Sequence, residues 1–183
     1  MYFKSIVSAG LLMLAASSSA IADSNFYVGG NYSFLDYSIT SVDDAQLGTL
    51  DVRAGTFFNS GFSGEVRLGF GVSDDTVYIL NSTKSGYDSY DFSLDYFAGA
   101  YLRSGVLTSG NFFPYLIAGV TTAEASTKSA TGTGSRSETD LSFGIGIDYT
   151  IKNTVTVNAE YINYISKGLV DISGFTLGIA KRF

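Results

Sequence analysis

Residues 171–183, DISGFTLGIAKRF, carry the clearest strand pattern in this chain. Successive side chains of a β-strand point to opposite sides, so an extended stretch has two faces. One face here is mainly apolar and ends on an aromatic residue, with Phe175, Leu177, Ile179, Lys181 and Phe183. The other face is small or polar, with Gly174, Thr176, Gly178, Ala180 and Arg182. Such a strand is typical of a barrel wall whose outer solvent is lipid.

Alternation of the same kind predicts seven further strands of about ten residues, the length of a tilted membrane-spanning strand. They cover residues 25–37, 49–58, 64–73, 92–103, 112–122, 140–150 and 154–164. Long polar connections alternate with short turns along the chain, as in outer-membrane barrels. We therefore predict an all-β fold, an eight-stranded antiparallel up-and-down transmembrane β-barrel, with both termini on the short-turn side.

The alternation also predicts which side chains face the lumen. In residues 92–103 it places Phe92 and Leu94 outside and Asp95 inside. In residues 112–122, where it is weakest, it places Phe113, Tyr115 and Ile117 outside. The Ser/Thr/Gly-rich segment 123–139 and residues 163–171 are predicted to be loops because they lack apolar periodicity.

The first 22 residues have the layout of a secretory signal peptide. Lys4 precedes an apolar run over residues 6–16, and Ala20-Ile21-Ala22 is a small-x-small cleavage site. We expect cleavage between Ala22 and Asp23, which leaves residues 23–183 as one barrel domain. No run of 18 apolar residues follows, so no transmembrane helix is expected.

The composition excludes several classes of protein. The 183 residues include 11 basic and 17 acidic side chains, so no basic surface for nucleic acid is expected. Cysteine and histidine are both absent, which excludes disulfides and a His- or Cys-based metal site or catalytic base. We therefore expect neither catalysis nor a cofactor nor a metal.

Nine charged residues are predicted to face the lumen. They are Asp51, Arg53, Glu65, Arg67, Asp95, Arg103, Asp148, Glu160 and Arg182. Every base in this set is Arg, whose planar fork suits bidentate pairing with carboxylates. Because an eight-stranded barrel is just wide enough to be filled by side chains, we expect a structural ion-pair network that plugs the lumen. The alternative is a narrow ion path.

The four predicted long loops are acidic. A solvated acidic rim is the simplest interpretation, and contact with a host or phage surface is the functional alternative. Asp43-Asp44 and Asp74-Asp75 are candidates for bridging divalent cations to lipopolysaccharide. Tyr78, Tyr87 and Tyr90 in the second loop are candidate contact residues or an aromatic girdle.

Several segments resemble the small eight-stranded barrels of bacterial outer membranes, the family of OmpA-type transmembrane domains, OmpX/Ail-like proteins and opacity-type adhesins. They are FYVGGNYSF, VRAGTFFNSGFSGEVRLGFG, PYLIAGV, FGIGIDYTI, VNAEY and FTLGIAKRF. The resemblance implies an outer-membrane location with periplasmic termini, lipid and lipopolysaccharide as neighbours, and Phe183 as the signal read by the barrel assembly machinery. Lys181 departs from the family pattern, which often has an apolar residue there.

Together these observations predict a non-enzymatic integral outer-membrane protein with a structural or surface-exposed role, in envelope integrity or in adhesion through its loops. A small porin-like channel is the alternative. A lipid-modifying barrel enzyme is the third possibility, which the absence of histidine disfavours.

Overall fold

The computed structural model describes residues 25–39, 45–80, 87–106, 108, 110–130, 132–151, 154–167 and 170–183. The predicted signal peptide, with its cleavage site at Ala22 and Asp23, lies outside these residues. So do Asp43 and Asp44. No helix that is long and apolar enough to cross a membrane occurs in the described part of the chain.

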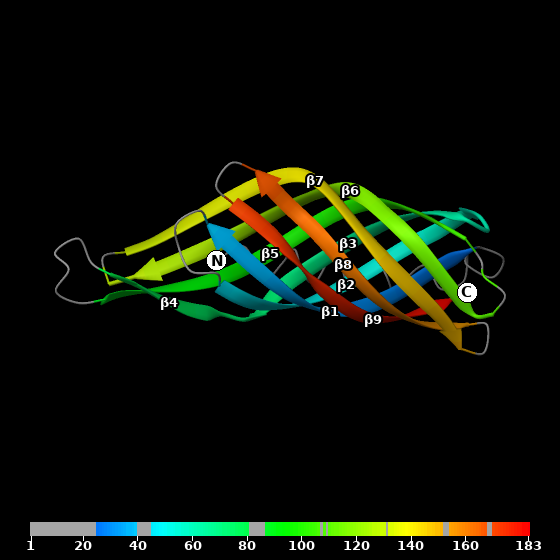
Figure 1. Cartoon of the computed structure of the whole chain (residues 1–183), viewed down its shortest axis with the longest axis horizontal. Helices are drawn as coiled ribbons and strands as arrows, with labels where there is room; N and C mark the ends of the chain where they lie inside the picture. Colours follow the sequence, from blue (N-terminus) through cyan, green and yellow to red (C-terminus); the bar gives the residue numbers. More distant parts are fainter. Residues whose placement is uncertain are drawn as a thin grey trace, which may run out of the picture.

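The described residues form strands that wrap around a common axis (Figure 1). The strands are β1 (Phe26–Ile39), β2 (Ala45–Asn59), β3 (Phe62–Ser73), β4 (Asp75–Leu80), β5 (Tyr87–Gly105), β6 (Phe112–Ser129), β7 (Gly132–Ile151), β8 (Val155–Lys167) and β9 (Val170–Arg182). β3 and β4 are separated only by Asp74, and both pair with β5, so together they form one bent barrel strand.

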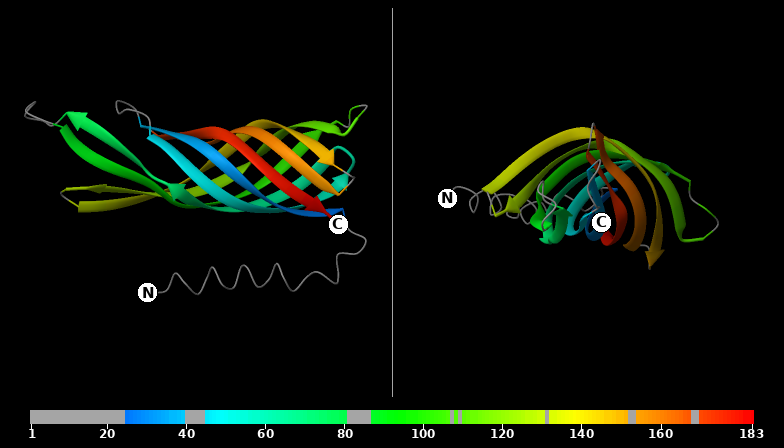
Figure 2. Two further views of the ribbon diagram at one scale, coloured as in Figure 1. Left: turned by 90° about the horizontal axis from the view of Figure 1, so that it is seen from below. Right: turned by 60° about the vertical axis from the view of Figure 1, so that its left-hand side comes forward.

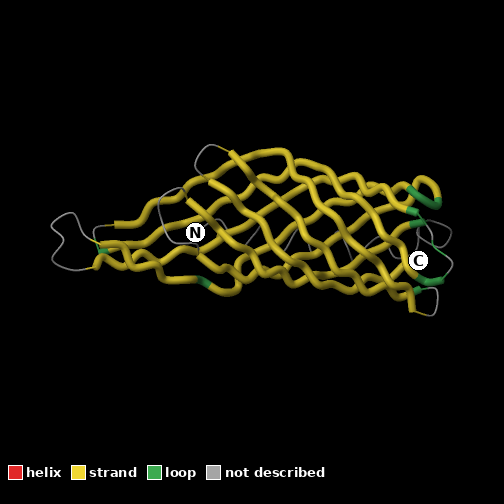
Figure 3. The backbone as a smooth tube through the Cα atoms, viewed as in Figure 1, coloured by secondary structure: helices red, strands yellow, loops and turns green. Residues whose placement is uncertain are grey.

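Pairing of the last strand with the first closes the barrel. β9 pairs antiparallel with β1 from Tyr27↔Arg182 to Ile39↔Val170, and β3 pairs with β5. Every neighbouring pair is antiparallel, which leaves no sheet edge around the barrel body (Figure 3). The prediction of a closed eight-stranded antiparallel barrel is confirmed. Closure satisfies the backbone hydrogen-bonding groups that lipid cannot solvate.

The two ends of the barrel differ. β1 starts and β9 finishes at one end, which we call the terminal end, where the β2–β3 turn at Ser60 and Gly61 also lies. At the opposite end, which we call the hairpin end, β4 to β7 remain paired with one another well beyond the other strands (Figures 1 and 2).

Two predicted loops are therefore largely strand. β6 and β7 pair from Phe112↔Tyr149 to Ser129↔Gly132, across most of residues 123–139. β8 and β9 continue to Lys167 and from Val170, within the predicted loop 163–171. In residues 123–139 the sequence signal failed because the composition is mainly polar, whereas the backbone hydrogen bonds of a hairpin need no apolar face. In residues 163–171 an irregularity between Asn163 and Ile165 interrupts the alternation, although Tyr164, Ile165 and Val170 are buried.

Apolar side chains cover the outside of the barrel as predicted. Leu116, Ile145 and Leu177 are 64%, 61% and 47% exposed, and similar residues from the other strands complete the belt. Aromatic residues of the lumen lie over glycines of the neighbouring strand. Phe97 faces Gly69 and Tyr115 faces Gly146, and a β-carbon at either glycine would collide with the ring. Glycine on the inner face therefore makes room for large lumen side chains.

Two predictions about orientation were wrong. A bulge between Leu94 and Tyr96 shifts the register of β5, so Phe92 and Leu94 point inward and Asp95 lies outside. A bulge adds one residue to one strand and so exchanges its faces. In β6, Phe113, Tyr115 and Ile117 are buried in the lumen, and Phe112 and Leu116 face outward. Both faces of this segment are apolar, so alternation could not distinguish them.

Candidate functional site: the barrel lumen

Seven of the nine predicted lumen charges lie buried inside the barrel. They are Asp51, Arg53, Glu65, Arg67, Arg103, Asp148 and Glu160. Asp95 is the exception explained by the bulge, and its carboxylate accepts a hydrogen bond from Ser126 on the outer surface. Arg182 has the inward parity of β9 but is exposed at the terminal end, with its guanidinium carbon 4.0 Å from the centre of the Phe57 ring.

Arg67 lies at the centre of the buried network. Its Nη1 and Nη2 donate to Glu160 Oε2 and Oε1 at 2.6 and 2.9 Å, a bidentate pair between β3 and β8. Its Nε donates to Glu65 Oε1 at 2.5 Å. All three side chains are fully buried. Bidentate geometry is the arrangement that best compensates the large desolvation cost of a buried charge.

Two further arginines bind the same carboxylates from the terminal side. Arg53 Nη1 lies 3.5 Å from Glu65 Oε2 and 3.6 Å from Glu160 Oε1. Arg103 Nη1 lies 3.4 Å from Glu65 Oε2, and its Nη2 lies 2.5 Å from Asp148 Oδ2. The network thus contains three guanidiniums and three carboxylates drawn from β2, β3, β5, β7 and β8, so it fixes several strands relative to one another.

Tyrosine hydroxyls complete the coordination of the carboxylates. Tyr27 donates to Glu65 Oε2 at 2.6 Å, and Tyr115 donates to Glu160 Oε1 at 2.5 Å. The Arg103 guanidinium carbon lies 3.7 Å from the centre of the Tyr115 ring, a cation–π contact. Sequence reasoning missed Tyr115, since the alternation of β6 placed it outside the barrel.

Asp51 is buried but stands apart from the ion pairs. Asn31 Nδ2 donates to its Oδ1 at 2.7 Å, and no guanidinium of the described chain lies within ion-pair distance of it. Near Asp51 a band of buried hydroxyls crosses the lumen, in which Ser33 and Thr176 lie 2.8 Å apart and Thr121 contacts Ser142 at 2.6 Å. These hydroxyls hydrogen-bond to one another or to tyrosines. The described lumen does not pair any of them with a group that could act as a general base.

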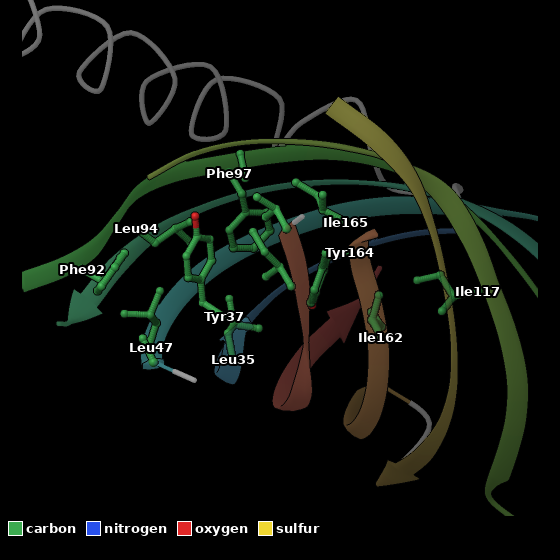
Figure 4. Close-up of a cluster of buried hydrophobic side chains, with 14 of the residues drawn as sticks. Leu35, Tyr37, Leu47, Phe92, Leu94, Phe97, Ile117, Ile162, Tyr164 and Ile165 are labelled. Atoms are coloured by element: carbon green, nitrogen blue, oxygen red, sulfur yellow. The ribbon is translucent and has the colours of Figure 1, made fainter. Parts of the chain in front are cut away.

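The lumen toward the hairpin end is filled by apolar side chains (Figure 4). Leu35, Phe97 and Tyr164 pack there with Ile162 and Ile165, of which the last two are completely buried. A cavity of about 10 Å³ among Leu35, Phe97 and Tyr164 is near the minimum that holds one water. This apolar plug was not predicted from the sequence, although Leu35, Tyr37 and Ile172 have inward parity at the hairpin ends of their strands.

The geometry therefore defines a membrane barrel whose lumen is closed by side chains. Residues 6–183 match the family described as outer membrane protein beta-barrel domain. The chain belongs to this family, and the outer membrane is its location. No curated protein sequence matches the chain.

The solved structures of similar fold include several small outer-membrane proteins. Neisserial surface protein A is 20% identical, with 87% of this chain and 98% of that chain covered and a TM-score of 0.66. Ail of Yersinia pestis is 16% identical, with 87% and 99% covered and a TM-score of 0.63. The N-terminal β-barrel domain of Pseudomonas aeruginosa OprF is 14% identical, with 87% and 98% covered and a TM-score of 0.57. At these identities the likeness concerns the fold alone.

Proposed function

We propose that this chain is a non-enzymatic structural protein of the outer membrane that displays its hairpin end at the cell surface and does not conduct. The filling of the lumen by two successive layers is the observation that carries this proposal. The ion pairs around Arg67 close the middle, and the apolar plug around Phe97 and Ile165 leaves almost no space for water. A conducting path would have to displace both layers.

Conductance distinguishes this proposal from the channel alternative. Reconstituted into planar lipid bilayers, the protein should give no stable single-channel steps. Regular ohmic steps would support the small porin-like channel instead. As a control for insertion, the same preparation should migrate faster on an unheated detergent gel than after boiling, because a closed barrel is more compact than the unfolded chain.

A lipid-modifying enzyme is disfavoured by the chemistry of the chain. Neither histidine nor cysteine is present. The buried serine and threonine hydroxyls of the described lumen bond to other hydroxyls, tyrosines or backbone carbonyls, or, at Thr49 and Ser63, have no hydrogen-bond partner in the described chain. The test is incubation of purified protein with phospholipid and lipid A, followed by mass spectrometry. Any change in acylation would contradict the non-enzymatic assignment.

The hairpin end determines which surface partner suits this protein. Its described residues include ten carboxylates and three basic side chains. Ail has been solved with the heparin analogue sucrose octasulfate. An acidic hairpin end repels such a polyanion, so we infer that a host or phage partner would be neutral or basic. Retention on heparin resin at low salt would contradict this inference.

Assembly and orientation are part of the same proposal. We infer that residues 1–22 are removed before Asp23, that the terminal end faces the periplasm, and that Phe183 is read by the barrel assembly machinery. Support comes from the signal-peptide layout and from the position of Phe183, whose N–H donates to Phe26 O at 3.0 Å where the barrel closes. Removal of Phe183 should lower the outer-membrane yield in cells while leaving refolding in detergent intact. Equal yields would contradict the role of Phe183.

A further inference from the structure

A hollow of about 440 Å³ lies on the outer wall of the barrel, near the hairpin ends of β1 and β2. Its lining comes from β1, β2, β3, β8 and β9. It is separate from a cavity of about 330 Å³ at the terminal end of the lumen, near Arg182 and Phe57. Because the hollow lies on the outer wall, its occupant must come from the surroundings of the barrel.

The hollow lies where a glycine interrupts a row of aromatic side chains. Phe34 pairs with Gly48 on one side and with Phe175 on the other, and Phe175 pairs with Tyr161. All three aromatic side chains are exposed on the outer wall. A β-carbon at Gly48 would lie only 2.5 Å from Tyr32 Oη, so a larger residue there would fill the hollow.

The next rung toward the hairpin end is polar. Asp36 pairs with Gln46 on one side and with Ser173 on the other. Asp36 and Gln46 are exposed, and neither side chain has a hydrogen-bond or ion-pair partner among the described residues. The hollow therefore offers a free carboxylate acceptor and an amide that can both donate and accept.

The hollow is continuous with the lipid-facing belt. One rung toward the terminal end, Tyr32 pairs with Leu50 and with Leu177, which are exposed members of that belt. Since the chain belongs to an outer-membrane family, the molecules that meet this wall are lipids. A lipid in the hollow has its acyl chain beside the belt and its head group beside Asp36.

The polar rung discriminates between lipid head groups by charge. A phosphate would be repelled by Asp36 and would meet no lysine or arginine among the described lining residues. The hydroxyls of a sugar can instead donate to the Asp36 carboxylate and exchange hydrogen bonds with Gln46. Sugar hydroxyls thus complement the free groups of the hollow better than a phosphate does.

We propose that the hollow binds the sugar head group of an outer-leaflet glycolipid, whose acyl chain packs against Phe34 and Phe175. The sugar hydroxyls donate to Asp36 and bond to Gln46. This site deepens the structural role proposed above by naming a specific lipid partner. It rests on the orientation proposed there, which places the hairpin end at the cell surface.

The experiment uses isotope-labelled protein in phosphatidylcholine nanodiscs that contain increasing fractions of monoglucosyl diacylglycerol or of phosphatidylglycerol. Backbone amide shifts of Asp36, Gln46 and Gly48, which line the hollow, report on binding. We expect shifts that saturate with the glycolipid and about fivefold weaker binding of phosphatidylglycerol, the value of one hydrogen bond. Equal binding of the two lipids, or shifts that rise linearly without saturation, would mean nonspecific lipid contact only and would overturn the proposal. Equally tight binding of phosphatidylethanolamine would overturn the assignment to a sugar.

The matched variants are Asp36→Asn and Asp95→Asn, each of which removes one exposed carboxylate from the outer wall. Asp95 lies on β5, which does not line the hollow. Asp36→Asn should weaken glycolipid binding by a factor of about five, and Asp95→Asn should leave it unchanged. Both residues lie outside the buried ion-pair network, so both variants should fold. Equal binding by the two variants would overturn the role of Asp36.

The orientation is tested separately. Ser135→Cys introduces the only cysteine of the chain at the exposed hairpin end, where it should react with a membrane-impermeant maleimide in intact cells. Failure to react would overturn the proposed orientation. Because the nanodisc titration does not depend on orientation, the two failures are distinguishable.

Discussion

The half of the lumen nearer the termini is lined with arginine, carboxylate and tyrosine, whereas the half nearer the hairpins is filled mainly with aliphatic and aromatic side chains. Both halves are buried inside the same eight-stranded wall, yet they gain stability in different ways. Around Arg67 each charge must be matched in number and geometry, because an unpaired one would retain its full desolvation cost. Around Ile165 only volume and shape must match.

The two layers make different contributions to the barrel. The ionic layer joins strands that are far apart in the chain, since Arg67 of β3 and Glu160 of β8 are separated by 93 positions. It therefore specifies how the barrel closes. The contacts of the apolar layer do not depend on bond direction, but this layer excludes water from the lumen. Substitutions in the two layers should consequently lower stability for different physical reasons.

Glu160→Gln should have the largest effect. It leaves Arg67 and Arg53 buried without their shared carboxylate, which should lower the free energy of unfolding by about 3–5 kcal/mol. The measurement is a urea titration of protein refolded in lipid vesicles, followed by circular dichroism because the chain has no tryptophan. Asp51→Asn is the matched control, since Asp51 is a buried carboxylate without an ion pair. Equal losses for the two variants would show that ion pairing is not what matters.

Ile162→Ala tests the apolar layer. Ile162 is completely buried, so the loss of its side chain and the resulting cavity should cost about 2–5 kcal/mol. The control is Ile145→Ala on the neighbouring strand, where the side chain is 61% exposed on the outer surface and loses contact mainly with lipid. The same urea titration should therefore separate the two variants. If the two variants lower the free energy of unfolding equally, the lumen near Ile162 is not close-packed.

A charge on the outer belt should act through lipid instead of through packing. Ile145→Arg or Leu177→Arg places a guanidinium near the middle of the apolar belt, at a cost of about 2–4 kcal/mol in unfolding from bilayers. Ser137→Arg, at the exposed hairpin end, is the control and should change little. An unchanged unfolding midpoint for the belt variants would contradict the assignment of this face to lipid.

Glu138→Gln should have the smallest effect. It removes an ion pair of the same chemistry as the lumen pairs, with Arg136 Nη2 2.7 Å from Glu138 Oε1, but the Arg136 side chain is 66% exposed. Water and salt screen such a pair, so the expected loss is below about 1 kcal/mol. Comparison with Glu160→Gln in the same vesicles isolates the contribution of burial. A loss as large as that of Glu160→Gln would mean that burial does not control the strength of these pairs.

The sequence predicted the barrel well because its outer solvent is lipid. An apolar belt requires apolar and polar side chains to alternate along each strand wherever the inner face is polar. This alternation can be recognised in residues 140–150 and 171–183 without any knowledge of neighbouring strands. The same alternation placed Arg53, Arg67 and Glu160 in the lumen, because a charged residue on the lipid face is costly near the middle of the bilayer.

Prediction failed where alternation carries no information. In β6 both faces are apolar, so Tyr115, which donates a hydrogen bond to Glu160, was placed outside the barrel. In β5 a single bulge exchanged the faces at Asp95, and nothing in the local sequence marks an added residue. Along residues 123–139 the polar composition suggested a loop, whereas cross-strand hydrogen bonds extend the hairpin.

The class of fold, the lipid-facing belt and the set of buried charges can be predicted from the sequence alone. Each follows from a local rule, the alternation of side chains along an extended chain. Three other features arise only when the barrel closes: the pairing of each arginine with its carboxylate, the apolar plug of the hairpin half, and the cavity at the terminal end. These features depend on the stagger between strands that are far apart in the chain. Barrel closure sets this stagger, and it cannot be deduced from the sequence of any single strand. For Asp171 to Phe183 the division is clear: the sequence determined that this stretch faces lipid, and closure against β1 determined its register.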